Sequence, residues 1–567
     1  MEEIVSKARS IATGIYIFLI FLVFPLYVED HYWEMGDCKM KFYLYTTAIY
    51  LALMLGVELV RGLHGKWDVH NLGVCDWCAI LYGICVILTL LAAEDRAAVW
   101  VGEKGWYMGA AAQLMFLATY FVVSRSRIPV QVLVWCNALG SGICFLIGIL
   151  QRLGFDLLHM YEGLADILLS DYLSTVGNRT WMSGYACAVF PIGVYLFWQA
   201  ESRRQRLLWG GYSALAFAGQ VATYSDSVYV GVGVVFFALG IMSIGNPERM
   251  RSFLRLLCLW FGQALLMCGL RALCGSRVRD ARGLTCDMYK WQWMLAGLVI
   301  CLVILIGMEY LFQRMTERRK VSQTMDRLSA NRVWRIQRGC LTATAIIGAL
   351  VVLLMILNTA GVLEQWFGIT IHNRYLYFDD AWGDARGWTW RMTCRMFEGL
   401  PFSRKLFGVG ADCFAYYAYG IPEYAETFRE IWGNVLLTNA HNEWLNMIFC
   451  QGIVGGLSYL GIFASGAAGC LLYGEGKSED EGEIPMDAQE TGGIKQALVP
   501  GIGLCLLAYM GHNFFCYQQI CATGPIFVLL GIGVAIVRES WFHKAREDDE
   551  EQISLGVFTP SKKDDID

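Results

Sequence analysis

One histidine stands where a long polar segment gives way to an apolar one, within residues 439–445, NAHNEWL. Histidine exchanges a proton near neutral pH and often serves as a general base. At a membrane surface, His441 could take a proton from a substrate carried by a lipid. The alternative is an interfacial histidine that only anchors the next helix, and this segment by itself allows both interpretations.

Arginines upstream of this histidine could bind an anion. Residues 385–397, ARGWTWRMTCRMF, have the periodicity of an amphipathic helix. Three apolar side chains fall on one side of that helix: Trp388, Met392 and Met396. Arg391 and Arg395 are four residues apart, so on a helix they would be neighbours, and an anion between them would relieve their repulsion. Arginine suits bidentate phosphate contacts. The alternative is a solvated face with two unrelated arginines.

A glycine-rich stretch separates the arginines from the histidine. Pro401 is followed by residues 408–414, GVGADCF. Gly408 and Gly410 predict a tight turn, because glycine tolerates backbone conformations that other residues avoid. A role for this turn in cradling a phosphate has weaker support.

The elements that must position these residues are apolar helices. The chain has 567 residues, of which 56% are hydrophobic and 17% charged; soluble domains carry about 25% charge. Apolar runs of about 18 residues or more are long enough to cross a bilayer as helices. We therefore predict an all-α polytopic membrane protein with about 14 transmembrane helices. The predicted spans are 11–28, 43–60, 72–93, 106–124, 130–151, 181–199, 207–224, 227–245, 252–273, 290–313, 339–360, 453–473, 497–515 and 522–537.

The Lys and Arg distribution predicts the orientation. With a cytoplasmic N-terminus, most Arg-rich loops fall inside, as the positive-inside rule expects. Both termini are then cytoplasmic, in the plasma membrane, and residues 361–441 lie outside. One outer segment is basic against this rule: Arg271, Arg277, Arg279, Arg282 and Lys290. These residues are either tolerated loop charge or a patch for an anionic substrate.

The chain divides into four parts by composition: membrane helices 1–11 in 1–360, a long external loop with short helices and the candidate active site in 361–441, the last membrane helices in 442–537, and an acidic cytoplasmic tail in 538–567. Residues 474–496 and 539–567 are polar and acidic, which predicts disorder. Long ordered loops often carry function. We expect the chemistry in 361–441.

Cysteines and membrane charges give weaker signals. Most of the 20 cysteines lie in apolar runs, where cysteine packs as a small hydrophobe. Two pairs at outer segments, Cys274 with Cys286 and Cys516 with Cys521, could form disulfides or stay reduced. Glu58 and Asp226 are the main expected charges within the membrane.

The order of these motifs resembles the O-antigen ligase/polymerase family. The resemblance covers residues 386–473: Arg386-x-x-x-Trp390, then Pro401, then the glycine turn, then His441 with Asn442, then the glycine-rich start of the next span. Residues 177–180, GNRT, are similar to an upstream Gly-Asn element of the family. Members of this family are polytopic membrane proteins.

The resemblance implies an enzyme. Family members transfer a glycan from an undecaprenyl-diphosphate carrier to a hydroxyl of a lipid-linked glycan or lipid A core, on the outer face of the plasma membrane. It makes His441 the essential histidine and Arg386 the arginine of the outer loop. Where many members have a Ser-Arg pair, this chain has Asp226, so another arginine must contact the diphosphate. Arg179 and the 277–282 cluster are candidates.

The implied partners are a lipid-linked saccharide, a glycan or lipid acceptor and membrane lipids, without nucleic acid. The implied site combines the base His441 with substrate-binding Arg386, Arg391, Arg395, Arg179 and Asn442. No cofactor or metal is expected. His512, in a second Gly-His-Asn segment, is interpreted as a packed or interfacial histidine whose loss should matter less.

Two other functions remain open. A metal-dependent polytopic glycosyltransferase could use the acids of 29–31, EDH, or Asp379 and Asp380. A transporter or flippase of lipid-linked saccharides would be expected to show internal repeats and functional charges within the membrane.

Overall fold

A computed structural model of the chain describes residues 2–63, 72–279, 290–319, 330–373, 375–473 and 486–554. The first half comprises α1 (Glu2–Phe18), the π-turn η1 (Leu19–Val23), α2 (Phe24–Leu26), α3 (Met35–Leu63), α4 (Val74–Ala92), α5 (Arg96–Val101), α6 (Ala110–Val123), α7 (Val130–Arg152), η2 (Asp166–Leu168), β1 (Tyr172–Leu173), β2 (Gly177–Asn178), α8 (Arg179–Gln199), α9 (Arg203–Ala222), α10 (Ser227–Ser243), α11 (Pro247–Cys274) and η3 (Gly275–Arg277). The second half comprises α13 (Trp291–Arg319), α14 (Ala330–Thr359), α15 (Val362–Phe367), α16 (Trp382–Glu398), α17 (Phe402–Phe407), α18 (Phe414–Gly420), α19 (Pro422–Trp432), α20 (Glu443–Leu472), α21 (Met486–His512) and α22 (Ile520–Ser554). β1 and β2 pair antiparallel, with Tyr172 opposite Asn178.

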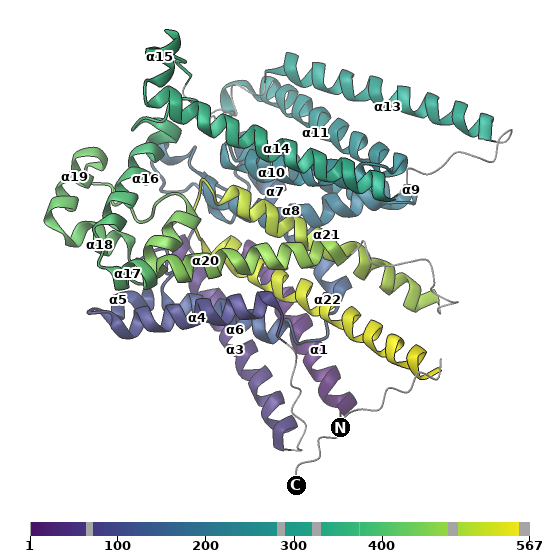
Figure 1. The fold of residues 1–567 in the computed structure, drawn as a ribbon, viewed down its shortest axis with the longest axis horizontal. Coiled ribbons are helices and arrows are strands. Elements are labelled where there is room, and N and C mark those ends of the chain that lie inside the picture. Colours follow the sequence, from purple (N-terminus) through teal and green to yellow (C-terminus); the bar gives the residue numbers. More distant parts are fainter. Residues whose placement is uncertain are drawn as a thin grey trace.

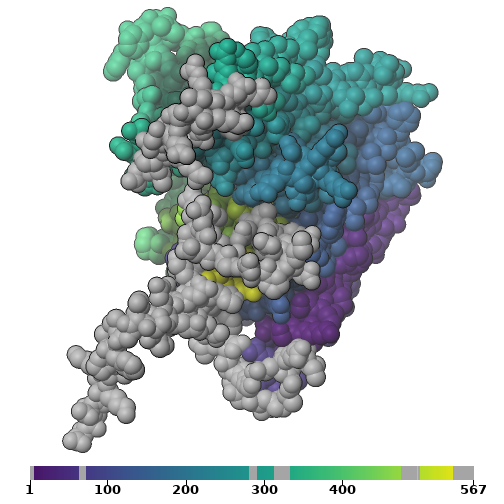
Figure 2. All heavy atoms as spheres, turned by 90° about the vertical axis from the view of Figure 1, so that its right-hand side faces the viewer, coloured from purple at the N-terminus to yellow at the C-terminus, as the bar shows by residue number. Residues whose placement is uncertain are grey.

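The long helices form a bundle with two distinct ends. We call the end where α15–α19 gather the loop end, at the left of Figure 1, and the opposite end the tail end. Figure 2 looks onto the tail-end side, with the N-terminal helices in purple at the lower right.

Ten helices of the described chain are long and apolar enough to cross a membrane, and three shorter apolar helices accompany them. This confirms an all-α, multi-pass membrane architecture, whereas the count of about 14 spans stays a prediction. In the span Arg332–Thr359 of α14, none of the most apolar window is buried inside the protein. An apolar helix without protein cover is suited to contact lipid.

Polar residues that the sequence places before apolar runs start several helices. The side chain of Asn178 accepts from the backbone N–H of Thr180 at the start of α8, and Ser202 accepts from that of Gln205 at the start of α9. Asn246 starts α11 in the same way, with Pro247 in its first turn. Each cap satisfies backbone N–H groups that the helix leaves without partners.

The loop end carries a small hydrophobic core of its own. The predicted amphipathic helix exists as α16, and Trp388, Met392 and Met396 are all buried, as expected from their spacing. They pack against apolar side chains of α18, α19 and α20, including Phe414, Phe428 and Phe449. The long loop is therefore an ordered lobe, held against the bundle through α20.

α20 is bent sharply at one glycine. Gly452 has a φ of 72° inside the helix, and a Cβ there would lie 2.2 Å from backbone atoms of Leu406. Gly408, with a φ of 90°, approaches the backbone of Cys450 equally closely. Only residues without a side chain permit this contact between α17 and α20. The predicted tight turn at Gly408 and Gly410 is thus confirmed.

Two polar segments predicted to be disordered are partly helical. α21 already begins at Met486, and α22 continues to Ser554, well beyond the predicted end of the last span at 537. Strong helix formers such as Ala, Glu, Lys and Arg continue both helices past their apolar parts. Residues 474–485 and 555–567 lie outside the described residues.

The two expected membrane charges are not buried, and the Cys516–Cys521 pair is reduced, one of the two outcomes left open by the sequence. The Glu58 carboxylate is 37% exposed and Asp226 is exposed, because both lie near helix ends. Within the part of the chain that the structure describes, the buried Asp, Glu, Lys and Arg residues are Lys39, Asp76, Arg152 and Glu443. Cys516 and Cys521 are free thiols with different neighbours, as is Cys274, whereas Cys286 lies outside the described residues.

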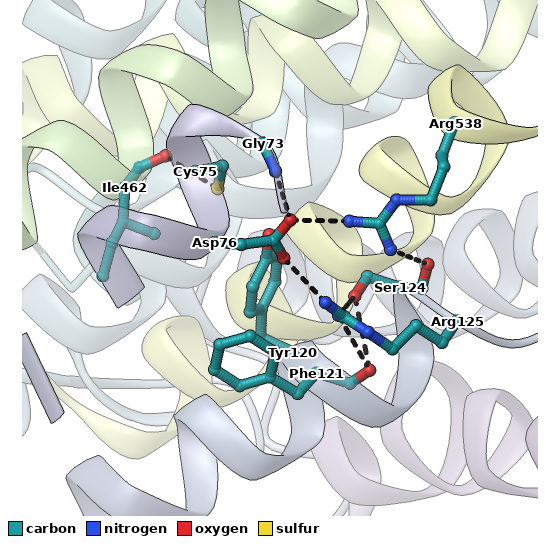
Figure 3. A network of polar contacts seen from close by, with 9 residues as sticks. All are labelled: Gly73, Cys75, Asp76, Tyr120, Phe121, Ser124, Arg125, Ile462 and Arg538. Atoms are coloured by element: carbon teal, nitrogen blue, oxygen red, sulfur yellow. Dashed lines mark hydrogen bonds and ion pairs between the residues drawn. The ribbon is translucent and has the colours of Figure 1, made fainter. Parts of the chain in front are cut away.

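A buried ion-pair network joins three helices at the tail end (Figure 3). The Asp76 carboxylate of α4 contacts Arg538 of α22 at 2.7 Å and Arg125, after α6, at 3.2 Å. The Tyr120 hydroxyl and the Gly73 backbone N–H also donate to it. The Asp76 side chain is 1% exposed, so its charge depends on these partners.

We predict that Asp76→Asn lowers the unfolding midpoint clearly. The substitution would leave two guanidinium groups facing each other without an anion, and breaking a buried pair costs about 3 kcal/mol or more. Thermal unfolding in detergent, followed by tryptophan fluorescence, measures the change. The matched control is Glu58→Gln, which removes a more exposed ion pair and should cost less than about 1 kcal/mol. Equal shifts in both variants would contradict the prediction.

We predict that the loop end faces outward. Single cysteines at two exposed positions, Tyr416→Cys in the loop-end lobe and Glu201→Cys at the tail end, would be placed in a background without other reactive thiols. A membrane-impermeant maleimide should label position 416 in intact cells and position 201 only after lysis. The reverse pattern would contradict the orientation and any function that depends on it.

Candidate active site

His441 is held in a strained turn directly before α20. Its φ is 50°, a left-handed conformation that non-glycine residues rarely adopt. Its backbone N–H donates to Asn439 Oδ1 at 3.0 Å, and Asn442 caps α20 by accepting from the N–H of Leu445 at 3.0 Å. The imidazole meets the Tyr517 ring edge to face, with centroids 5.2 Å apart. The turn therefore fixes the direction of the imidazole.

Arg386 is anchored to the same loop as His441. Its Nε donates to the Phe515 carbonyl at 3.0 Å and one terminal nitrogen donates to the Gly383 carbonyl at 2.5 Å. Residues 383–385 turn through left-handed conformations before α16 becomes regular. Because Phe515 and Tyr517 both belong to the loop 513–519, this loop brings together two residues that lie 55 positions apart in the sequence.

Burial and charge keep the His441 imidazole neutral. Desolvation is the larger cause and the Arg386 guanidinium the second, and together they lower the pKa of His441 to about 3. A neutral imidazole has a free nitrogen lone pair, but a pKa this low makes it a weak base at neutral pH while no anion is bound. A nearby anion would raise its pKa again and strengthen it as a base.

Asp412 ties the lobe to another outer segment. One oxygen of its carboxylate accepts from the backbone N–H groups of Glu103 and Met108, at 2.8 and 3.0 Å. Burial raises the pKa of Asp412 to about 7. The amide groups of Gly408 and Gly410 donate to the carbonyls of Arg404 and Cys450. Since these amides are already bonded, the turn serves packing better than phosphate binding.

Several arginines gather around Tyr224, between α9 and α10. The guanidinium carbons of Arg152 and Arg271 lie 4.6 and 5.4 Å from the Tyr224 ring centroid. Arg152 also donates to the Arg279 carbonyl at 2.7 Å. We call Arg152, Arg179, Arg271 and Arg279 the arginine cluster. Arg271 and Arg279 of the expected basic patch belong to it, whereas Arg282 lies outside the described residues.

Arg179 connects this cluster to the start of α8. It pairs with Asp171 at 3.4 Å and donates to the Tyr224 carbonyl at 3.5 Å. The neighbouring Trp181 accepts through its backbone carbonyl from Gln519 Nε2 at 3.4 Å. The start of α8 therefore borders both the arginine cluster and the loop that contacts His441.

The remaining predicted site residues have other contacts. Arg391 pairs with Asp380 on the exposed side of α16, and the two side chains are 55% and 60% exposed. Arg395 is exposed one turn further. The Asn442 side chain is buried and caps α20, so its carbonyl oxygen is already used. These positions belong to the predicted segment, but the structure gives them no contact with His441.

Two of the acids that a metal-dependent glycosyltransferase could use, Asp30 and Asp380, each pair with a different basic side chain. Asp30 contacts His31 at 3.0 Å, and Asp380 pairs with Arg391. Among the described residues, no group of three or more His, Cys, Asp or Glu side chains is arranged to hold a metal ion.

Sequence reasoning missed the importance of the loop 513–519 and of the residues beneath it. Tyr517 carries no motif, and Glu443 follows His441 in the motif without being assigned a role. The repeated His-Asn dipeptide, at 441–442 and 512–513, could have indicated that the two segments belong to one site. The backbone N–H of Glu443 donates to the Asn513 carbonyl at 2.9 Å, so the two segments meet in the structure.

Strained backbone is concentrated at the loop end. Within the described chain, the non-glycine residues with positive φ are His31, Glu34, Tyr107, His159, Ser174, Tyr224, Asp384, Ala385, Asp412 and His441. All of them lie in segments of the loop end. Such conformations persist where surrounding contacts enforce them, and they cluster at functional sites.

Comparison with known proteins adds no assignment. No protein-family model matches this chain, and no curated protein matches it.

Proposed function

We propose that this protein is a membrane glycosyltransferase of the O-antigen ligase/polymerase type. It would transfer a glycan from an undecaprenyl-diphosphate carrier to a hydroxyl acceptor at the outer face of the plasma membrane. The observation that supports this most strongly is the shared anchoring of Arg386 and His441 on the loop 513–519, beside the arginine cluster. A base and an arginine held on one loop, with further arginines around Tyr224, suit transfer from a lipid diphosphate at a membrane surface.

The chemistry needs a base and stabilised leaving-group charge. The acceptor oxygen forms a bond to the anomeric carbon as its proton passes to the His441 imidazole. The bond from that carbon to the diphosphate oxygen breaks, and the electron pair leaves with the diphosphate. Arg386, with N–H groups beyond those bonded to Phe515 and Gly383, is placed to stabilise that charge. The diphosphate anion in turn raises the pKa of His441 during transfer.

The direct test uses purified protein in detergent with a lipid-linked saccharide donor and a candidate acceptor. The expected product is acceptor carrying the glycan, with release of undecaprenyl diphosphate, in the presence of a chelator. Activity that disappears with the chelator would favour the metal-dependent glycosyltransferase instead. ATP-independent passage of the intact donor across a vesicle membrane, without any transfer, would favour the flippase.

We predict an unusual pH dependence for this transfer. Because the pKa of His441 is lowered to about 3 in the free protein, the base form persists as pH falls through the ordinary histidine range. The acid limb of kcat/KM, which reports the free enzyme, should therefore lie below pH 5, whereas kcat, which reports the complex, should fall at a higher pH. Initial rates between pH 4 and 9 show whether kcat/KM stays flat through the ordinary histidine range while kcat falls within it. A kcat/KM limb near the ordinary pKa of about 6.5 would contradict the assignment.

A further inference from the structure

A hydrogen-bonded chain inside the bundle begins two residues after His441. The Glu443 carboxylate accepts from the Tyr459 hydroxyl at 2.6 Å, from the Tyr509 hydroxyl at 3.0 Å and from the Asn513 amide nitrogen. Glu443 and Asn513 are each 1% exposed. Three N–H or O–H groups aimed at one buried carboxyl satisfy its hydrogen-bonding capacity.

His512 continues the chain in the opposite direction. Its Nδ1 lies 2.5 Å from Asn513 Oδ1, and its Nε2 lies 2.8 Å from Ser183 Oγ and 3.1 Å from Ser227 Oγ. Because the Asn513 nitrogen donates to Glu443, its oxygen must accept, and this assigns a proton to His512 Nδ1. Nε2 then meets the two serine hydroxyls.

The chain ends at the turn 223–227, around which the arginine cluster gathers. Ser227 contacts Ser225 at 2.9 Å, and the Cys516 thiol donates to Ser227. The same turn holds Tyr224, whose ring meets Arg152 and Arg271. His512 thus lies between two segments. One is the turn 223–227, beside the arginines that would hold the diphosphate, and the other is the start of α20, next to the proposed base His441.

We infer that His512 is a positioning residue, which fixes the turn 223–227 relative to the turn 439–443. This inference rests on the proposed function, because it concerns the distance between the leaving diphosphate and the proton-accepting imidazole. The four helices α8, α10, α20 and α21 meet at this chain, so it can fix their outer ends against one another. The interpretation of His512 from sequence, as a histidine of lesser importance, is replaced by this one.

The polar character of the chain argues for more than packing. Apolar side chains of similar volume would stabilise a buried site at least as well, whereas a hydrogen-bonded network imposes one arrangement. An error of about 1 Å between reacting groups lowers a rate about 10²-fold. A network that fixes the distance between the two turns should therefore have a large effect on the rate of transfer and a smaller effect on the stability of the fold.

The test separates the two sides of the imidazole. His512→Asn retains a group near Nδ1 for Asn513, and His512→Gln retains one near Nε2 for the serines. Both variants should lose about 10²-fold in kcat, with the KM for the glycan donor nearly unchanged. Adding Ser183→Ala and Ser227→Ala to His512→Asn should cause little further loss, since the link is already broken. Ser243→Ala is the matched control, because it removes a buried, hydrogen-bonded serine at the tail end of the same helix α10.

Amide hydrogen exchange gives a readout that needs no substrate. In His512→Asn, residues 223–228 should exchange faster while 439–446 stay protected, and His512→Gln should show the reverse. Unchanged exchange in both variants, or an unchanged kcat with wild-type KM, would overturn the inference. If the wild-type protein transfers no glycan, the proposed function fails and the positioning role in transfer falls with it. The exchange result then still decides whether His512 links the two turns.

Discussion

His441→Ala is expected to abolish glycan transfer while leaving membrane insertion intact. General-base catalysis contributes about 10²–10⁴ in rate, and His441 is an imidazole close enough to Arg386 to be influenced by its charge. Alanine is also a smaller side chain in the same strained turn, so Asn439 and Asn442 retain their backbone contacts. The measurement is product formation from the purified lipid-linked saccharide, with the chelator present.

Two controls keep this result interpretable. Size-exclusion behaviour and the unfolding midpoint of His441→Ala should match those of the wild-type protein. His372→Ala, which changes a histidine in a different part of the outer segment, should transfer at nearly the wild-type rate. Full activity of His441→Ala would refute the mechanism.

Arg386→Ala should lower kcat about 10²–10³-fold, the loss seen when one electrostatic stabiliser of developing charge is removed. Its guanidinium both anchors to the Phe515 carbonyl and faces the region of His441. Arg386→Lys should recover only part of the rate, because an ammonium group cannot donate to Phe515 and form a two-pronged phosphate contact at once. Steady-state kinetics with the same glycan donor measure both variants.

Arg391 and Arg395 provide the comparison within the same helix. From the sequence, Arg391 has as much claim to the diphosphate as Arg386. In the structure its charge is paired with Asp380 and more than half exposed, so Arg391→Ala and Arg395→Ala should lose much less than Arg386→Ala. A larger loss in Arg391→Ala would place the diphosphate on the exposed face of α16 and contradict the assignment to Arg386.

The sequence was informative wherever the signal is local. Apolar runs predicted the helices, the spacing of Trp388, Met392 and Met396 predicted the buried face of α16, and two glycines predicted a turn. Each of these depends on residues a few positions apart. The meeting of Arg386 and His441 was implied only by the family resemblance, since they are joined through a loop that follows both in the sequence.

The parts that could not be predicted depend on tertiary packing. Hydropathy treats Asp76 and Glu443 as isolated acids, and only the folded bundle supplies the arginines and tyrosines that surround them. The partner of Arg391 was also beyond prediction, because helical periodicity identifies a neighbour such as Arg395 but not a partner outside the helix such as Asp380. Burial and pairing decide the role of a charge, and neither is encoded locally.

The bend at Gly452 divides α20 into two helical rods that meet at this residue. The outer rod, residues 443–451, is roughly 13 Å long at about 1.5 Å per residue, and it carries His441 at its far end. A swing of about 5° at this bend would displace that end by roughly 1 Å, the scale at which rates change about 100-fold. The close backbone contact between Gly452 and Leu406 therefore helps to set the angle between the two rods. If His441 acts as proposed, the position of its imidazole depends on the packing of Gly408 and Gly452 as well as on its own turn.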